Sequence, residues 1–183
     1  MRSLKIAALL GLIMLLAAFL LPAEMQAETE YTGSNFRLVI PEGWELVEED
    51  AQGQLQEFIF LVPEDVEALE ADEFQYATNV NVVVEELAAD FTTEEYLDIM
   101  LRQVEGRLEE FELLSRSQAG LAGVEGLTVE YEGLTDAGEE LSWQEWVVIR
   151  EESAYVVSYS ASRDRFADYR EDVELILDSF AFQ

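Results

Sequence analysis

The sequence contains no histidine and no cysteine, and its only lysine is Lys5. These absences remove Ser-His-Asp and Cys-His nucleophiles, lysine Schiff bases, disulfides and metal sites built on His or Cys. Carboxylate chemistry remains, because paired Asp or Glu residues hydrolyse glycosidic bonds without any of these groups. We therefore expect a binding or structural protein rather than an enzyme, with no catalytic residue and no cofactor.

The first 27 residues have the pattern of an export signal. Arg2 and Lys5 precede a charge-free run over residues 6–21, and Pro22 breaks this run ahead of Ala27. This order is typical of a Sec-type signal peptide, so we expect cleavage after Ala27 and a periplasmic or extracellular product with no stable membrane insertion. The alternative is a membrane anchor that stays uncleaved, although the run is shorter than the roughly 18 to 20 residues of a spanning helix.

Acidic residues dominate the rest of the chain. The full sequence has 40 acidic and 10 basic residues, a net charge of −30, and the first 27 residues contribute only Arg2, Lys5 and Glu24 to that count. Such a charge argues against nucleic acid and anionic lipid as partners, because proteins bind phosphates through Lys and Arg. It also predicts repulsion among carboxylates that salt would screen. Adaptation to a salty or alkaline environment and simple solubility both explain the acidity.

Residues 28–183 have a length that fits a single domain. Alternating apolar residues predict strands at 36–40, 56–62, 79–85, 127–132, 141–150 and 154–161. The last three are joined by short connections and predict an antiparallel meander.

Individual strands carry further expectations. In the strand 79–85, Val80, Val82 and Val84 share one face, whereas Asn79 and Asn81 share the other. The strand 56–62 is apolar on both faces, so we expect it to be covered on both sides. Trp143 and Trp146 lie on opposite faces of their strand, and we expect both to be core anchors.

Two amphipathic helices are predicted. The first spans about 93–110 and begins with Thr92 and Glu95 at the spacing of a capping box. Its apolar stripe includes Leu97 and Phe111 and is typical of a core-facing surface. The second spans about 164–177, with Phe166 on its stripe. Strands, a helix, more strands and a final helix predict an α+β sandwich in which helices pack on an antiparallel sheet.

Several short motifs, in this order, resemble those of the PsbP-like/DcrB-related superfamily over nearly all of residues 28–183. The residues are Phe36, Pro41, Gly43 and Trp44, then Thr92, Glu94, Glu95 and Tyr96, then Ala154 and Tyr155, and finally Ser179, Phe180 and Phe182. The resemblance implies a three-layer α/β/α fold with a central antiparallel sheet, and binding rather than catalysis.

Relatives in that superfamily include photosystem II extrinsic subunits, bacterial envelope proteins, a Ran-binding nuclear protein and chaperones of secretion effectors, so the fold does not fix the function. The predicted signal peptide disfavours the nuclear and cytoplasmic roles. The resemblance therefore implies an exported accessory protein that binds another envelope protein or a ligand, and it transfers no functional residue.

Two other classes of function remain open. A carboxylate-dependent hydrolase would need a pair of acids, for which Glu85 with Glu86 and Glu139 with Glu140 are candidates. These neighbours would point to opposite faces of an extended chain. An enzyme would show a concave pocket with converging carboxylates of raised pKa, whereas a binding module would show a flat apolar patch.

Weak Ca²⁺ binding is the second alternative. No EF-hand loop occurs in the sequence, but the acidic stretch 63–76 contains oxygen ligands of the type that Ca²⁺ prefers. The candidate ligands are Glu67, Glu70, Asp72 and Glu73. A solvated acidic loop is the competing interpretation.

Overall fold

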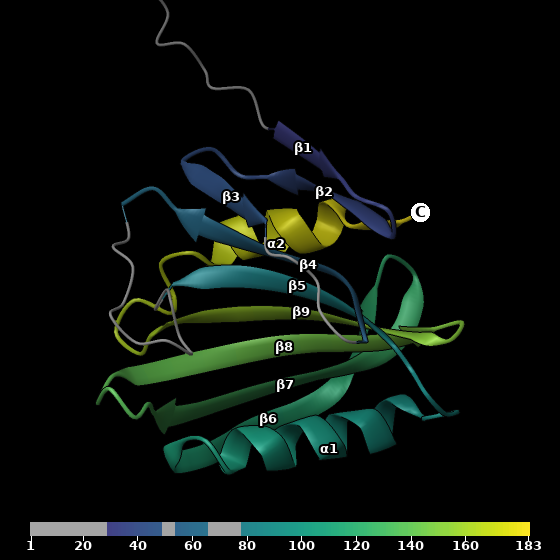
Figure 1. Cartoon of the computed structure of the whole chain (residues 1–183). Helices are drawn as coiled ribbons and strands as arrows, with labels where there is room; N and C mark the ends of the chain where they lie inside the picture. Colours follow the sequence, from purple (N-terminus) through teal and green to yellow (C-terminus); the bar gives the residue numbers. More distant parts are fainter. Residues whose placement is uncertain (1–28, 49–53, 66–77) are drawn as a thin grey trace, which may run out of the picture.

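The computed structural model describes residues 29–48, 54–65 and 78–183, in which the chain forms ten strands and two helices (Figure 1). The strands are β1 (Thr29–Thr32), β2 (Phe36–Ile40), β3 (Trp44–Glu48), β4 (Leu55–Pro63), β5 (Asn79–Glu86), β6 (Glu109–Leu121), β7 (Val124–Leu134), β8 (Glu140–Arg150), β9 (Ser153–Ser162) and β10 (Ala181–Phe182), and the helices are α1 (Thr93–Glu105) and α2 (Arg170–Ser179). The predicted signal peptide, residues 1–27, lies outside the described residues. No helix in the described ranges has the length and apolar composition needed to cross a bilayer.

Seven strands form one antiparallel sheet in the order β3-β4-β5-β9-β8-β7-β6, and the other three form a small sheet in the order β1-β2-β10. Strands β7, β8 and β9 pair in sequence order, which confirms the predicted meander. Strand β5 then pairs with β9, so the first half of the chain joins the second half at the centre of the large sheet.

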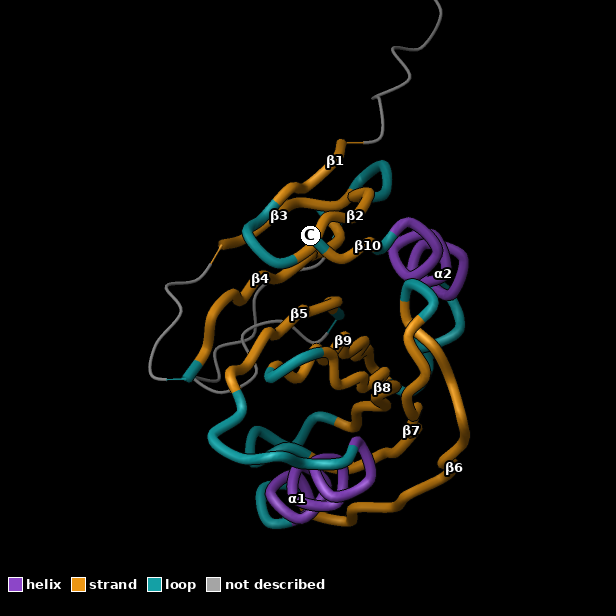
Figure 2. Tube along the Cα trace, turned by 90° about the vertical axis from the view of Figure 1, so that its right-hand side faces the viewer, coloured by secondary structure: helices purple, strands orange, loops and turns teal. Residues whose placement is uncertain are grey.

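The two helices lie apart, with strands of the large sheet between them (Figure 2). Helix α1 packs through Leu97 against Val129 and Val147 on one face of the sheet. The other face, which carries Val82, is covered by α2 through Ile176 together with the small sheet. The structure is therefore α+β with a mainly antiparallel sheet, as predicted. Strands β1 and β10 were not predicted, because they are too short to leave a periodic signal in the sequence.

Helix α1 begins where the sequence predicts. The backbone N–H of Glu95 donates to Thr92 Oγ1 at 3.2 Å, and the backbone N–H of Thr92 donates to Glu95 Oε2 at 2.9 Å, which completes the capping box. The predicted end at residue 110 is wrong, because the helix stops at Glu105 with Gly106 as its C-cap. Phe111 lies instead on β6, from which it still packs against the same core.

The second helix is shorter than predicted. Residues 163–169 form turns, and α2 begins only at Arg170. Phe166 and Tyr169 are nevertheless buried in the core beside Val173, as their spacing predicts. The apolar spacing fixed which side chains face inward, but it did not distinguish a helix from consecutive turns.

Candidate functional site

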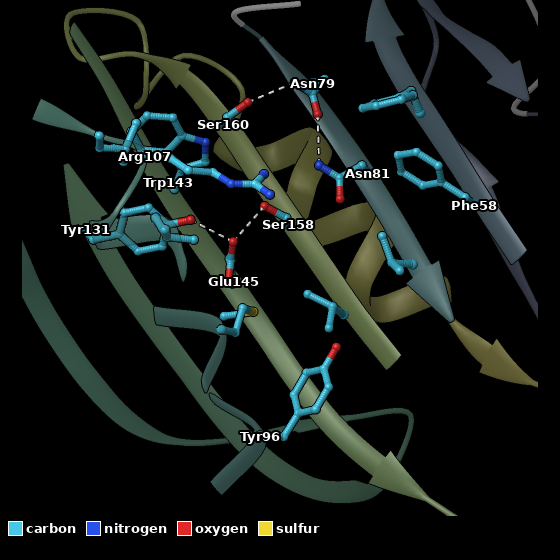
Figure 3. Close-up of a pocket in the computed structure, with 16 residues that line it drawn as sticks. Phe58, Asn79, Asn81, Tyr96, Arg107, Tyr131, Trp143, Glu145, Ser158 and Ser160 are labelled. Atoms are coloured by element: carbon cyan, nitrogen blue, oxygen red, sulfur yellow. Dashed lines mark hydrogen bonds between the residues drawn. The ribbon is translucent and has the colours of Figure 1, made fainter. Parts of the chain in front are cut away.

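A pocket of about 350 Å³ lies on the α1 side of the large sheet (Figure 3). Side chains from β4, β5, β7, β8, β9 and α1 line it. Helix α1 packs mainly against β7 and β8, and the pocket lies between the helix and the strands further along the sheet. Its volume is at the lower end of the roughly 300–1,000 Å³ typical of small-molecule sites. We call it the Glu145 pocket.

The floor of the Glu145 pocket holds a buried acid on β8. Glu145 is only 6% exposed. Its Oε1 accepts hydrogen bonds from the Tyr131 hydroxyl at 2.7 Å and from the Ser158 hydroxyl at 3.2 Å. Its Oε2 is buried and has no hydrogen-bond partner among the described residues.

The surroundings of Glu145 favour its neutral form. Burial raises the pKa of the Glu145 carboxyl, and the two hydrogen bonds from Tyr131 and Ser158 oppose that effect only in part. Burial and the nearby Glu145 in turn raise the pKa of the Tyr131 hydroxyl. Tyr96 reaches the pocket from α1, and the pKa of its hydroxyl is raised by burial and by its hydrogen bond to Glu85.

One side of the pocket is polar and neutral. Asn79 donates through Nδ2 to Ser160 Oγ at 2.8 Å, and Asn81 donates to Asn79 Oδ1 at 3.3 Å. The alternation of β5 is therefore as predicted, with the valines in the core and these two asparagines on the face that the pocket occupies.

The apolar wall comes from β4. The rings of Phe58 and Phe60 are 4.7 Å apart, and both side chains are half-buried at the pocket. Ile59 and Leu61, on the opposite face of the same strand, are fully buried in the core. The expectation that β4 is covered on both sides is thus met for the face of Ile59 and Leu61 and only in part for the other face, where Val62 is buried but Phe58 and Phe60 are not.

Arg107 brings a positive charge to the pocket. It follows α1 in the short turn before β6, and its side chain is directed into the pocket (Figure 3). Five other arginines form ion pairs with carboxylates, namely Arg37, Arg116, Arg150, Arg163 and Arg165. Arg107 has no such partner in the part of the chain that the structure describes.

The acid pairs singled out in the sequence lie elsewhere. Glu85 accepts a hydrogen bond from the Tyr96 hydroxyl at 2.7 Å, whereas Glu86 is exposed. Glu140 pairs with Arg163 at 3.3 Å, and Glu139 is exposed in the turn before β8. None of these four acids lines the Glu145 pocket.

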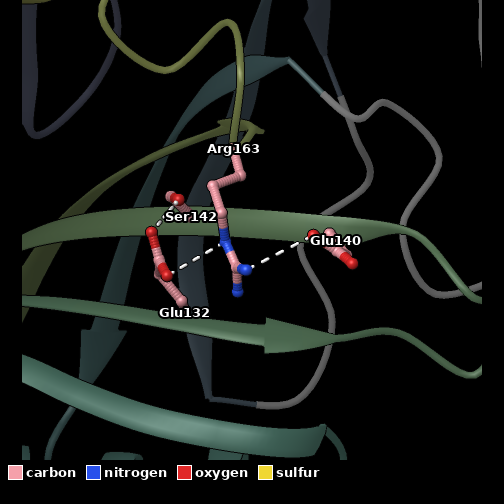
Figure 4. A network of polar contacts seen from close by, with 4 residues as sticks. All are labelled: Glu132, Glu140, Ser142 and Arg163. Atoms are coloured by element: carbon pink, nitrogen blue, oxygen red, sulfur yellow. Dashed lines mark hydrogen bonds and ion pairs between the residues drawn. The ribbon is translucent and has the colours of Figure 1, made fainter.

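Arg163 also contacts Glu132 Oε2 at 3.0 Å, and Glu132 accepts a hydrogen bond from Ser142 at 2.9 Å (Figure 4). This network connects the chain after β9 to β7 and β8, and within it Arg163 is the structural partner of Glu140. The pattern of neighbouring acids did not identify a catalytic pair.

The cation candidates Glu67, Glu70, Asp72 and Glu73 lie outside the described residues, so a Ca²⁺ site in this stretch stays a prediction. Within residues 29–48, 54–65 and 78–183, no group of three or more potential ligand side chains is placed to hold a metal ion.

Sequence reasoning missed Glu145 and Arg107. The alternation of β8 puts Glu145 on the same face as Trp143 and Val147, both of which are buried. An acid between two buried apolar residues on one face of a strand was the available signal, because an inward-facing carboxyl needs a partner or a ligand. Arg107 carried no comparable signal in its local sequence.

No family model matches the sequence, and no curated protein sequence matches it. Solved structures with a similar fold include cyanobacterial PsbP (CyanoP) from a Synechocystis species, with a TM-score of 0.57 and 15% identity over 88% of this chain and 96% of that one. LpqN of Mycobacterium tuberculosis, described as involved in cell envelope biogenesis, has a TM-score of 0.58 and 16% identity over 86% and 91% of the two chains. The Ran-binding protein Mog1p of Saccharomyces cerevisiae has a TM-score of 0.51 and 12% identity over 85% and 94%. The chain therefore has the PsbP-like fold that its motifs predict, and at these identities the likeness concerns the fold alone.

Proposed function

We propose that this chain is an exported, non-catalytic binding protein of the cell envelope that holds a small ligand in the Glu145 pocket. The observation that carries the proposal is the buried Oε2 of Glu145, which lacks a hydrogen-bond partner among the described residues although its side chain lines a pocket. Buried polar atoms in native proteins nearly always have a partner, so an exception at a pocket wall favours a bound molecule that supplies it.

The location rests on two independent indications. Residues 1–27 have the pattern of a cleaved signal peptide. LpqN, which shares the fold, is described as involved in cell envelope biogenesis. Both favour an envelope protein that works outside the cytoplasm, either alone or with another envelope protein as its partner.

The chemistry of the pocket favours binding over hydrolysis. Glycosidases need two carboxyl groups about 5 to 9.5 Å apart, one on each side of the bond that breaks. Glu145 is the only acid among the described residues that line the pocket. Histidine, cysteine and any lysine beyond Lys5 are missing from the sequence, so the serine hydroxyls of the pocket, Ser158 and Ser160, have no His, Cys or Lys beside them as a base.

Native mass spectrometry of the exported protein tests this proposal. We expect a protein whose chain starts at Glu28 and which retains a small molecule. Asn81→Trp should release this molecule, because Asn81 is a half-buried strand residue at the pocket and a larger ring would fill the space. The matched control is Ser115→Trp, at an exposed position of β6 outside the pocket, which should retain the ligand.

A wild-type protein without any retained molecule would count against the proposal, as would loss of the molecule in both variants. Turnover of glycosides that disappears in Glu145→Gln would favour the hydrolase alternative instead. Melting temperatures of both variants must stay near that of the wild type for the comparison to hold.

A further inference from the structure

We infer that the ligand of the Glu145 pocket is a small organic anion with an apolar body, whose charged head pairs with Arg107 while its body lies against Phe58 and Phe60. The inference rests on the proposed function, because it names the class of ligand that the same pocket takes.

The first step concerns Arg107. The sequence has four acidic residues for each basic one, 40 against 10, so an arginine in this protein has many carboxylates to pair with. Arg102, Arg107 and Arg170 nevertheless have no ion-pair partner among the described residues. Of these three, only Arg107 lines the pocket, into which its exposed side chain points (Figure 3). A guanidinium presents five N–H donors in a planar fork that matches a carboxylate. An anionic group in the pocket would complete its contacts.

The second step concerns the free oxygen of Glu145. Tyr131 and Ser158 both donate to Oε1, so the proton of the neutral acid belongs on Oε2. Oε2 then becomes a hydrogen-bond donor without an acceptor among the described residues. The titratable and hydroxyl-bearing side chains that line the pocket with this carboxyl are Tyr131 from β7, Ser158 and Ser160 from β9, Tyr96 from α1, and Arg107. Because Arg107 and the neutral acid both offer donors, the ligand must supply acceptors.

The third step concerns the rest of the pocket. Phe58 and Phe60 from β4 and Met100 and Val104 from α1 line the pocket, and all four are half-buried. These side chains give an apolar lining next to the polar groups, which suits a ligand with an apolar chain or ring behind its charged head. A cationic ligand would meet the same apolar lining but would be repelled by Arg107.

Isothermal titration calorimetry of the exported protein with three eight-carbon probes tests the inference. Octanoate, octyltrimethylammonium and 1-octanol share an apolar chain and differ in the charge of the head. At an ionic strength of about 0.15 M, we expect octanoate to bind at least tenfold more tightly than either of the other two. Arg107→Gln should weaken octanoate at least tenfold. Arg102→Gln is the matched control, because Arg102 is an exposed arginine of α1 that does not line the pocket, and it should change the affinity less than twofold.

A second variant reports on Glu145. Glu145→Gln keeps an N–H donor where the neutral acid has its O–H, so octanoate should still bind. In the wild type, octanoate affinity should fall as the pH rises through the pKa of Glu145, because the ionised carboxylate repels the probe. The Gln variant should lose this dependence.

Binding of octyltrimethylammonium as tight as that of octanoate would overturn the inference, and so would an Arg107→Gln protein that behaves like Arg102→Gln. Failure of the wild type to bind octanoate would also overturn the inference. This holds even if the cause is that the Arg107 side chain pairs with Glu145 and fills the pocket. If native mass spectrometry still detects a retained molecule, that failure removes the anionic class and leaves the binding function intact. If no molecule is retained either, both proposals fail.

Discussion

Replacement of Trp44 tests how α2 is held to the large sheet. Trp44 is the first residue of β3 and is 7% exposed. Its ring meets that of Tyr169 edge-on at a centroid distance of 5.8 Å, and its Nε1–H donates to Asp172 Oδ2 at 3.0 Å. The side chain therefore joins an edge strand of the sheet to α2, whose residues come more than a hundred positions later in the sequence.

The expected loss follows from these contacts. Truncation of a buried Trp to alanine costs about 3–5 kcal/mol of unfolding free energy, through lost apolar contact and the cavity that remains. For a domain of this size that loss lowers the melting temperature by roughly 6 to 20 °C. Trp44→Phe keeps most of the ring contact but loses the hydrogen bond to Asp172, which is half-buried, so we expect about 1–2 kcal/mol.

Urea unfolding followed by far-ultraviolet circular dichroism measures both values, with an unchanged m-value as the sign that only stability has changed. A double-mutant cycle of Trp44→Phe with Asp172→Ala isolates the hydrogen bond, because a shared contact makes the two losses non-additive. A loss below about 1 kcal/mol in Trp44→Ala, together with lost partner binding, would refute the reasoning and identify Trp44 as a surface recognition residue.

Three further predictions concern charge. Burial raises the pKa of the Glu145 carboxyl above its ordinary 4.5, so the contribution of Glu145 to stability is complete below that value and is lost as the pH rises through the raised native pKa. The melting temperature of Glu145→Gln relative to the wild type should therefore rise with pH, and a constant difference would contradict this. Carboxylate repulsion predicts a melting temperature that climbs from low to molar NaCl, and a flat or falling response would exclude it as a dominant effect. Diffuse acidity predicts equal effects of Mg²⁺ and Ca²⁺, whereas saturable, Ca²⁺-selective heat that disappears when Glu67, Glu70, Asp72 and Glu73 are neutralised would reveal a specific site.

The elements predicted correctly are those whose signal is local. The capping box of α1 involves only Thr92 and Glu95, three residues apart, and it forms as expected. The meander of β7, β8 and β9 follows from alternation and short connections, which leave little choice of partner. The two tryptophans of β8 lie on opposite faces as expected, but only Trp143 is buried in the core, whereas Trp146 is half-buried against the core on the other face.

Strand β6 shows why other elements could not be predicted. It is exposed over most of its 13 residues, and its neighbouring Leu113 and Leu114 are 44% and 45% exposed. Without a buried face there is no alternation to detect. The strand forms because its backbone pairs with β7 through a tight turn in which Ala122 and Gly123 both have positive φ, at 49° and 81°. A turn of this kind matches the twist of the strands that it joins and fixes their pairing.

The Glu145 pocket depends on register in a way that no single segment of sequence reveals. Glu145 lies opposite Ser158 of β9 and opposite Val129 of β7, two residues from Tyr131. A shift of one residue in either pairing would turn one of the two hydroxyls to the other face of the sheet and leave Oε1 with a single donor. Among the 40 acids of the sequence, the apolar residues Trp143 and Val147 indicate that Glu145 faces inward, but they do not indicate which hydroxyls meet its carboxyl. The selection comes from three strands that bring two hydroxyls to the same carboxyl oxygen and leave the other oxygen without a hydrogen-bond partner among the described residues.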